Sequence, residues 1–347
     1  MNDQAARDDT TTSAQAAAPD PRRRPPAPPI TRHLVLVNQP GWQSVDDLFQ
    51  IARKVRWLDP SIAVFVVTAE VNDILASEKA AERPSLVVSF GPLGNFAPRR
   101  GKVYAGHQIA KLEQLRRLAA AGVPVPRTAY LTAQTPLDPA LWGEFVILKP
   151  SDIATSSHGL GFQLMRTSRV RYRPPEDYPE DHPARRGPMI VQQFVDTGEH
   201  VESFRVLLLF GEPLYCYRIV ARPPRVALDA PDDVLEAAIV QIQAVPVEDR
   251  VRTYVFDADV IMTARRAAQV VPHPPLLGCD VVRDHRNGRV YVLELNPGGN
   301  TWHFSSQHAA ASRAAEPPQL TAQRREQFDA MNLAAHVLVQ RTRAEAE

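Results

Sequence analysis

The sequence has few cysteines, no long apolar run and no excess of either charge. Cys216 and Cys279 are the two cysteines among 347 residues. They form no CxxC pair, so we expect buried free thiols in a reducing cytoplasm. No stretch approaches the roughly 20 apolar residues of a membrane span. The 40 Lys and Arg against 39 Asp and Glu give a net charge of +1, which excludes the basic field of a general nucleic-acid binder. A soluble cytoplasmic protein without membrane or nucleic-acid partners is expected.

Several catalytic motifs are also missing. No GxGxxG follows the first expected strand, which disfavours dinucleotide binding. A GxxxxGK[ST] phosphate loop, an HExxH zinc motif and a GxSxG nucleophile elbow are absent as well. The chain is therefore expected to be neither a Walker-type nucleotidase, a zinc protease nor a serine hydrolase.

The length predicts two or three compact units after a disordered tail. Residues 1–29 contain no Val, Ile, Leu, Phe, Trp or Tyr and six prolines, so they cannot bury enough apolar surface to fold. They also lack the apolar region of a secretory signal. We divide the remainder into an N-terminal Rossmann-like unit over 30–105, a small subdomain with a flap over 106–188, and a C-terminal subdomain over 189–347.

The N-terminal unit predicts an α/β fold. Continuous apolar runs alternate with segments of helical periodicity, and Ser44 is a candidate N-cap. This order is typical of a small parallel sheet covered by helices. The expected strands are 33–37, 62–67 and 86–90, and the expected helices are 45–58 and 71–79.

The sequence pattern after residue 105 predicts a mixture of strands and helices. Residues 167–187 are polar and rich in proline, which predicts a mobile surface insertion. The expected helices are 108–121, 233–243, 258–270 and 321–341, and the expected strands are 129–132, 145–149, 189–194, 204–210, 214–220, 277–283 and 289–296.

Two carboxylates lie in the last strand pair, and the turn between the strands decides whether they meet. A two-residue turn at Asn287-Gly288 would pair Asp280 with Leu295, and the acids would then face opposite sides. A loop over 286–288, with Gly288 in a left-handed bulge, instead pairs His285 with Arg289 and sets Asp280 across from Glu294. We expect the second register.

In that register Asp280, Glu294 and Asn296 form an all-oxygen cluster. Such a cluster suits Mg²⁺ or Mn²⁺ completed by water and phosphate oxygens. The alternative is an amphipathic hairpin whose acids face solvent.

Lys149 ends an apolar strand, and a glycine-rich stretch over 156–161 follows it. The amides of such a stretch are suited to covering phosphate oxygens.

The order of these features resembles the ATP-grasp superfamily, which includes D-alanyl-D-alanine ligases, glutathione synthetases and ribosomal-protein glutamate ligases. The shared features are a helical Lys111, Lys149 before Pro150, a glycine-rich flap, a Gln-Gln-Phe-Val hinge at 192–195 and the pattern Asp…Glu-x-Asn. The resemblance covers roughly 105–306 and implies an ATP-grasp fold after an N-terminal domain.

The resemblance also implies roles for individual residues. Lys111 and Lys149 would hold ATP phosphates under a flap containing Gly159 and Gly161, while Glu202 would bind the ribose. Arg218 or Arg205 would stabilise the transferred phosphoryl group. The adenine would lie along Gln192, Gln193, Phe194 and Val195, the magnesium ligands would be Asp280, Glu294 and Asn296, amides at Gly298, Gly299 and Asn300 would receive an oxyanion, and His303 or Ser305 would contact the acceptor.

Two positions depart from the family pattern. The D-alanyl-D-alanine ligases carry an Arg where this chain has Gly278, and the family often has an acid where this chain has Ser203.

The function that the resemblance implies is that of an ADP-forming ligase that makes carbon–nitrogen bonds. Such an enzyme converts a carboxylate into an acyl phosphate for attack by an amine. Its substrates would be small molecules or peptides, and a homodimer is one option for its assembly. The alternatives are a kinase acting on a hydroxyl and a non-catalytic nucleotide-binding protein.

Overall fold

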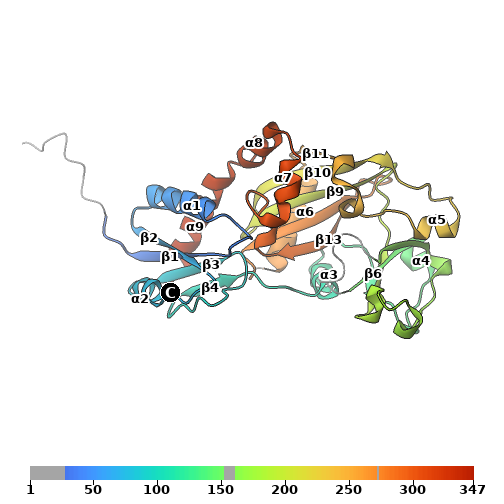
Figure 1. Ribbon diagram of the computed structural model, residues 1–347, viewed down its shortest axis with the longest axis horizontal. Helices are drawn as coiled ribbons and strands as arrows, with labels where there is room; N and C mark the ends of the chain where they lie inside the picture. The colour runs from blue at the N-terminus through green and yellow to red at the C-terminus, as the bar shows by residue number, and fades with distance from the viewer. Residues whose placement is uncertain (1–27, 152–160, 272) are drawn as a thin grey trace, which may run out of the picture.

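The computed structural model describes residues 28–151, 161–271 and 273–347. Three sheets follow one another along the long axis of the molecule (Figure 1). The disorder expected of the tail concerns residues that fall almost wholly outside the described ranges. None of the described helices is long and apolar enough to cross a membrane.

The first sheet is parallel and has the expected α/β character. Its strands β1 (Arg32–Asn38), β2 (Ile62–Thr68), β3 (Ser85–Ser89) and β4 (Lys102–Ala105) follow the order β2-β1-β3-β4. Helix α1 (Val45–Leu58) begins at Ser44, whose hydroxyl accepts from the amide of Asp46 at 3.2 Å, and α2 (Ile74–Ala81) begins at Asp73. The apolar pattern predicted β1 to β3, whereas β4, which is short and half exposed, carries no such signal.

The central sheet is antiparallel, with the order β11-β10-β9-β12-β13. Its strands are β9 (His200–Leu209), β10 (Glu212–Pro224), β11 (Arg250–Tyr254), β12 (Leu276–Arg283) and β13 (Val290–Pro297). Helix α6 (Ala258–Val270) packs on one face beside the buried free thiols Cys216 and Cys279. Helix α9 (Ala330–Glu345) packs on the other face and also contacts α1 (Figure 1). The C-terminal helix therefore joins the first sheet to the central one.

Two helix predictions in this region are wrong in extent. The segment 233–243 forms only the short α5 (Asp232–Glu236) and a 3₁₀ turn at Ile242–Ala244. The helix expected over 321–341 is two helices, α8 (Pro318–Glu326) and α9, because Asp329 between them adopts a left-handed φ of 48°. A short helix α7 (Ala310–Ala314) precedes them.

The third sheet is small and has the order β5-β8-β6-β7. It comprises β5 (Thr128–Tyr130), β6 (Phe145–Pro150), β7 (Gln163–Arg166) and β8 (Met189–Gln193), with α3 (Lys111–Ala120) and α4 (Pro139–Trp142) nearby. The segment 167–187 differs from the expected mobile insertion. It forms three 3₁₀ turns and buries Val170 and Ala184 against Trp142, so it is anchored to this sheet.

The register of the last hairpin is the one that aligns the two carboxylates, but the turn differs from expectation. Asp280 pairs directly with Glu294, and Gly288 has the left-handed φ of 73°. His285 does not pair with Arg289, because its amide donates to Asp196 O at 2.9 Å. The register shifts by one residue between Asp280 and Val281, and this bulge restores the alignment of the carboxylates.

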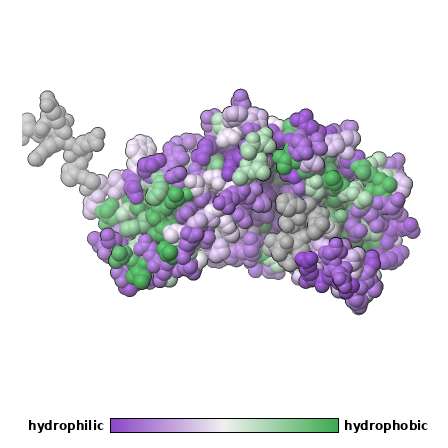
Figure 2. Space-filling model, viewed as in Figure 1, coloured by the Kyte–Doolittle hydropathy of each residue, from purple (hydrophilic) through white to green (hydrophobic). Residues whose placement is uncertain are grey.

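The surface of the visible face is mostly hydrophilic (Figure 2). Apolar side chains gather over the N-terminal sheet and at the opposite end of the molecule.

Candidate functional site

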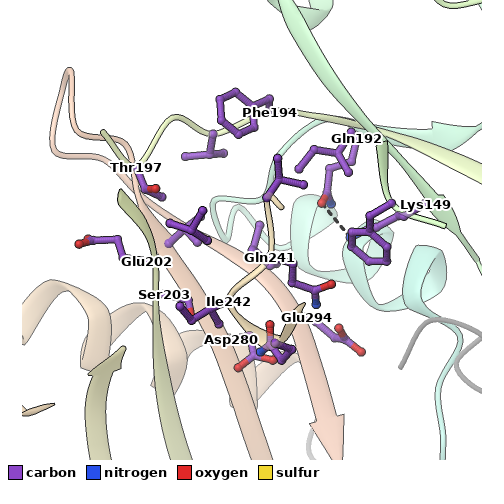
Figure 3. A pocket seen from close by; sticks show the side chains of 18 of the residues that line it. Lys149, Gln192, Phe194, Thr197, Glu202, Ser203, Gln241, Ile242, Asp280 and Glu294 are labelled. Carbon is purple, nitrogen blue, oxygen red and sulfur yellow. Dashed lines mark hydrogen bonds between the residues drawn. The ribbon is translucent and has the colours of Figure 1, made fainter. Parts of the chain in front are cut away.

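Two pockets meet between the central and small sheets. The hinge pocket lies beside the end of β8 and is lined by Lys149, Phe162, residues 192–195 and Glu202, among others (Figure 3). The loop pocket lies beside the chain that follows β13, including Gly298 and His303. The residues that line both pockets are Gln241, Gln243, Asp280 and Glu294. The carboxylates therefore stand at the junction of the two pockets.

The three oxygen-bearing side chains lie on one face of the sheet. The amide nitrogen of Asn296 donates to Oδ2 of Asp280 at 3.0 Å. Nζ of Lys111 lies 3.4 Å from Oε1 of Glu294. Asp280 also receives two hydrogen bonds from Arg205, one from Nη2 at 2.8 Å and one from Nε. Burial raises the pKa of Asp280, and Arg205 and Asn296 offset part of that rise.

The donor chemistry of this cluster fits a hard divalent cation. Two carboxylates and a side-chain amide are the oxygen ligands that Mg²⁺ accepts when phosphate and water complete its shell. No group of three His, Cys, Asp or Glu able to hold a metal occurs among the described residues. A cation here would thus depend on Asn296 and on a bound phosphate group.

Two lysines approach the junction from different elements. Lys111 begins α3, and its side chain is almost fully buried. Lys149 belongs to β6 and is 5% exposed, and its Nζ donates to Oε1 of Gln192 at 2.8 Å. Burial, together with the positive charge of Lys111, lowers the pKa of Lys149 to about 8, although Glu294 opposes the change.

The walls of the hinge pocket are largely apolar. Ile147, Phe162, Val240, Ile242 and Leu293 line it together with the backbone of the hinge. Such walls suit the flat ring of an aromatic base.

Only some of the residues expected near the ribose and the phosphates line the hinge pocket. Glu202 lines the hinge pocket and accepts from Nε of Arg218 at 3.0 Å, while Arg218 is exposed and is not among the residues lining either pocket. Gly161 also lies outside both linings, with a left-handed φ of 73°. The prediction for Gly159 falls outside the described residues.

The loop pocket contains most of the candidate acceptor residues. Gly298, Asn300 and His303 line it, and Gly299 and Asn300 belong to the 3₁₀ turn Gly299–Thr301. Burial and nearby arginines hold the pKa of His303 well below its usual value, so its ring is neutral near pH 7. Ser305 is engaged elsewhere, because its hydroxyl donates to Asp47 at 2.7 Å.

The guanidinium of Arg205 lies beside Gly278, where the sequence lacks a side chain. A Cβ on Gly278 would lie 3.1 Å from Nη1 of Arg205 and 2.8 Å from Cγ2 of Thr301. Gly278 and Arg205 are on neighbouring strands, with Asp280 paired directly with Arg205. The absence of a side chain at 278 therefore makes room for the guanidinium from β9.

Sequence reasoning missed several residues of the two pockets. Gln241 and Gln243 line both, but they lie in a segment for which a helix was predicted. Trp42, Gln108 and His308 line the loop pocket. No local pattern marks them, because they are brought together by contacts between distant segments.

No family model matches the chain, and no curated protein matches it. Among solved structures it is similar to the ATP-grasp ligase PsnB complexed with a minimal precursor, at 17% identity and a TM-score of 0.47, with 90% of this chain and 100% of that chain covered. It is also similar to the D-cycloserine synthetase DcsG, at 17% identity and a TM-score of 0.44 over 88% and 99% of the two chains.

A third similar structure is the D-alanine–D-alanine ligase from Bacillus anthracis complexed with ATP. The identity is 10% and the TM-score 0.41, with 89% of this chain and 98% of that chain covered. These likenesses concern the course of the chain and say nothing of this protein's substrates. Of these three proteins, PsnB is named as an ATP-grasp ligase.

Proposed function

We propose that this protein is an ATP-dependent carboxylate ligase of the ATP-grasp type. One observation carries the proposal: an apolar hinge pocket and a polar loop pocket share Asp280 and Glu294 at their junction, with Lys111 and Lys149 beside them. A nucleotide in the hinge pocket and an acceptor in the loop pocket would meet at this junction. Phosphoryl transfer requires that the two substrates be positioned together and that nearby groups neutralise the phosphate charge.

The proposed nucleotide position follows from the chemistry of the walls. The adenine would lie among the apolar side chains near 192–195, and the ribose near Glu202. The phosphates would extend toward Lys149 and Lys111, whose ammonium groups match their charge. Asp280, Glu294 and Asn296 would hold Mg²⁺, which when bound neutralises phosphate charge and aligns the transferred group.

The proposed reaction has two steps. A substrate carboxylate oxygen attacks the γ-phosphorus of ATP, the bond to the bridging oxygen breaks, and ADP leaves. An amine then attacks the carbonyl carbon of the acyl phosphate and loses a proton, and phosphate departs as the amide forms. Arg205 lines the loop pocket and is held by Asp280, so we assign it, rather than Arg218, to stabilise the developing charge.

Hydrogen-bond donors in the loop pocket support a carboxylate substrate. Lys111 and Arg205 line the pocket, and a substrate carboxylate can accept from their N–H groups. Both cations are paired with the two carboxylates of the pocket and His303 is neutral, so these donors, rather than an excess of positive charge, favour a small-molecule or peptide carboxylate. The amides of Gly299 and Asn300 would receive the oxyanion that forms when the amine attacks, whereas those of Gly298 and Thr301 already donate to Leu276 O and Gly298 O.

The test is an ADP-release assay with pools of carboxylic acids and amines, followed by trapping with hydroxylamine. A ligase gives carboxylate-dependent ADP and a hydroxamate. A stable phosphoester without hydroxamate identifies a kinase, and ATP binding without ADP release across all pools indicates a non-catalytic nucleotide-binding protein.

The matched variants are Glu294→Gln at the junction and Glu82→Gln on the exposed surface. The first removes a charge without changing volume, so we expect it to abolish ADP release while the circular dichroism spectrum is unchanged. The second should leave turnover unaltered. Equal turnover in both variants would remove Glu294 from the proposed site.

A further inference from the structure

A third concave surface borders the hinge pocket, with which it shares Gln193. It runs between helix α3, the segment 125–128 and the strand β13, and it reaches Gln193 at the hinge. We call it the arginine groove. Its lining residues are Leu112, Leu115, Arg116, Ala119, Val125, Pro126, Arg127, Thr128, Leu141, Gln193, Arg289 and Tyr291.

Three exposed arginines in the groove lie over aromatic rings. The guanidinium carbon of Arg116 is 5.9 Å from the ring centre of Tyr130, that of Arg127 is 5.8 Å from the ring centre of Trp142, and that of Arg289 is 5.3 Å from the ring centre of Tyr291. Contacts of this kind order a guanidinium without neutralising it. These side chains would therefore lose little conformational freedom on meeting an anion.

The charge of the groove is not balanced by its own walls. None of the described residues that line it is acidic. Arg116, Arg127 and Arg289 form no ion pair with a described carboxylate, whereas the neighbouring Arg117 pairs with Glu113 at 2.7 Å. The groove thus offers three unneutralised positive charges to a ligand.

The floor of the groove is apolar. Leu112 and Leu115 are buried beneath it, and Val125, Leu141 and Tyr291 contribute further apolar surface. A ligand that matches both the apolar floor and the three arginines carries apolar side chains between carboxylates. An acidic peptide segment has this composition.

We propose that the arginine groove binds an acidic peptide segment with interspersed apolar residues. A nucleic-acid strand fits less well, because its bases need open aromatic faces for stacking. Here Tyr130, Trp142 and Tyr291 already have arginines over their rings. The site stands apart from the loop pocket and does not depend on the proposed ligation.

The test uses the full chain and a fluorescein-labelled peptide of alternating Glu and Leu, with an alternating Gln and Leu peptide and a labelled oligothymidylate as comparison probes. Fluorescence anisotropy should show binding of the acidic peptide in preference to the neutral one. The triple variant Arg116→Gln, Arg127→Gln, Arg289→Gln should weaken that binding about tenfold or more. Raising the salt concentration severalfold should weaken it as well.

The control is Arg83→Gln, Arg99→Gln, Arg100→Gln, which removes the same charge from exposed positions in the N-terminal part of the chain. It should change affinity for the acidic peptide less than twofold. An equal loss in both triple variants would show a non-specific charge effect and overturn the proposal. So would oligothymidylate binding that the groove variant abolishes while peptide binding is unaffected, because the groove would then be a nucleic-acid surface.

Discussion

Nζ of Lys149 donates a hydrogen bond to Oε1 of Gln192, a neutral amide, rather than to a carboxylate. The nitrogen of that amide, Nε2, donates to the hydroxyl of Thr128 at 2.9 Å, so Gln192 presents its oxygen to the lysine. The buried ammonium is thus held in place without being neutralised by its hydrogen-bond partner. A bound phosphate would supply the missing negative charge.

We predict that ATP binding takes up a proton at Lys149 above pH 8. The pKa of about 8 in the free protein means that the amine is mostly neutral at pH 8.5. Phosphate oxygens nearby raise that pKa, so the bound form is protonated. Calorimetric titration with ATP at pH 8.5, in buffers of different ionisation enthalpy, should show uptake of between roughly half and one proton. At pH 6.5 the amine is already charged, and uptake at this group should vanish.

The matched variant for this prediction is Lys149→Arg, which keeps a positive charge over the whole range. Its ATP affinity should be lower overall but should depend less on pH between 7 and 9. Proton uptake that persists in this variant would assign the titration to another group.

We predict strong energetic coupling between Arg205 and Asp280. Both side chains are largely buried, and two hydrogen bonds join them. Arg205→Met leaves a buried carboxylate without its counter-charge, and the free energy of unfolding should fall by about 3 kcal/mol. Asp280→Asn should cost a similar amount, because it leaves the guanidinium unpaired.

The double variant separates coupling from packing. Arg205→Met with Asp280→Asn removes both charges. In urea unfolding, the decrease in its free energy of unfolding should therefore be at least about 1 kcal/mol smaller than the sum of the decreases in the two single variants. Strict additivity would mean that each residue acts independently.

Local sequence patterns predicted the parallel strands and the alignment of the two acids, but not the route to that alignment. The strands β1 to β3 are continuous apolar runs, and Gly288 marks the turn. The bulge between Asp280 and Val281 was missed, as was the bond from the amide of His285 to the carbonyl oxygen of Asp196, a residue from a distant segment. Such a contact leaves no local signal.

The same limit explains the helices that differ. One helix was expected across 321–341, but Asp329 divides it by a left-handed conformation that its sequence context does not announce. Arg205 was only one of two candidate cations from the sequence. Its contact with Asp280 and the room left by Gly278 appear only once β9 and β12 are neighbours.

We predict that Asp47 stabilises the chain after β13. Its Oδ2 accepts from Nε1 of Trp302 at 2.9 Å and from the hydroxyl of Ser305, and its Oδ1 accepts from Arg325 at 3.0 Å. Asp47→Ala leaves the fully buried indole nitrogen unsatisfied, and the free energy of unfolding should fall by about 2–4 kcal/mol. The neighbouring Asp46→Ala, at an exposed position, should change it by less than about 0.5 kcal/mol. Equal losses in urea unfolding would contradict a specific role for Asp47.

We predict that a single methyl group at position 278 disturbs the junction of the two pockets. In Gly278→Ala the new Cβ would meet Cγ2 of Thr301 at 2.8 Å and Nη1 of Arg205 at 3.1 Å. The overlap should lower the free energy of unfolding by about 1–3 kcal/mol, and ADP release should fall because Arg205 is displaced.

The overlap can be relieved from its other side. Thr301→Ser removes the crowding methyl group but keeps the hydroxyl that donates to Gly298 O at 2.8 Å. Adding it to Gly278→Ala should therefore recover most of the lost stability, whereas alone it should have little effect. If urea unfolding shows no recovery in the double variant, the steric contact with Thr301 does not cause the loss. Recovery of stability without recovery of ADP release would assign the remaining defect to Arg205, the other group that the new methyl approaches.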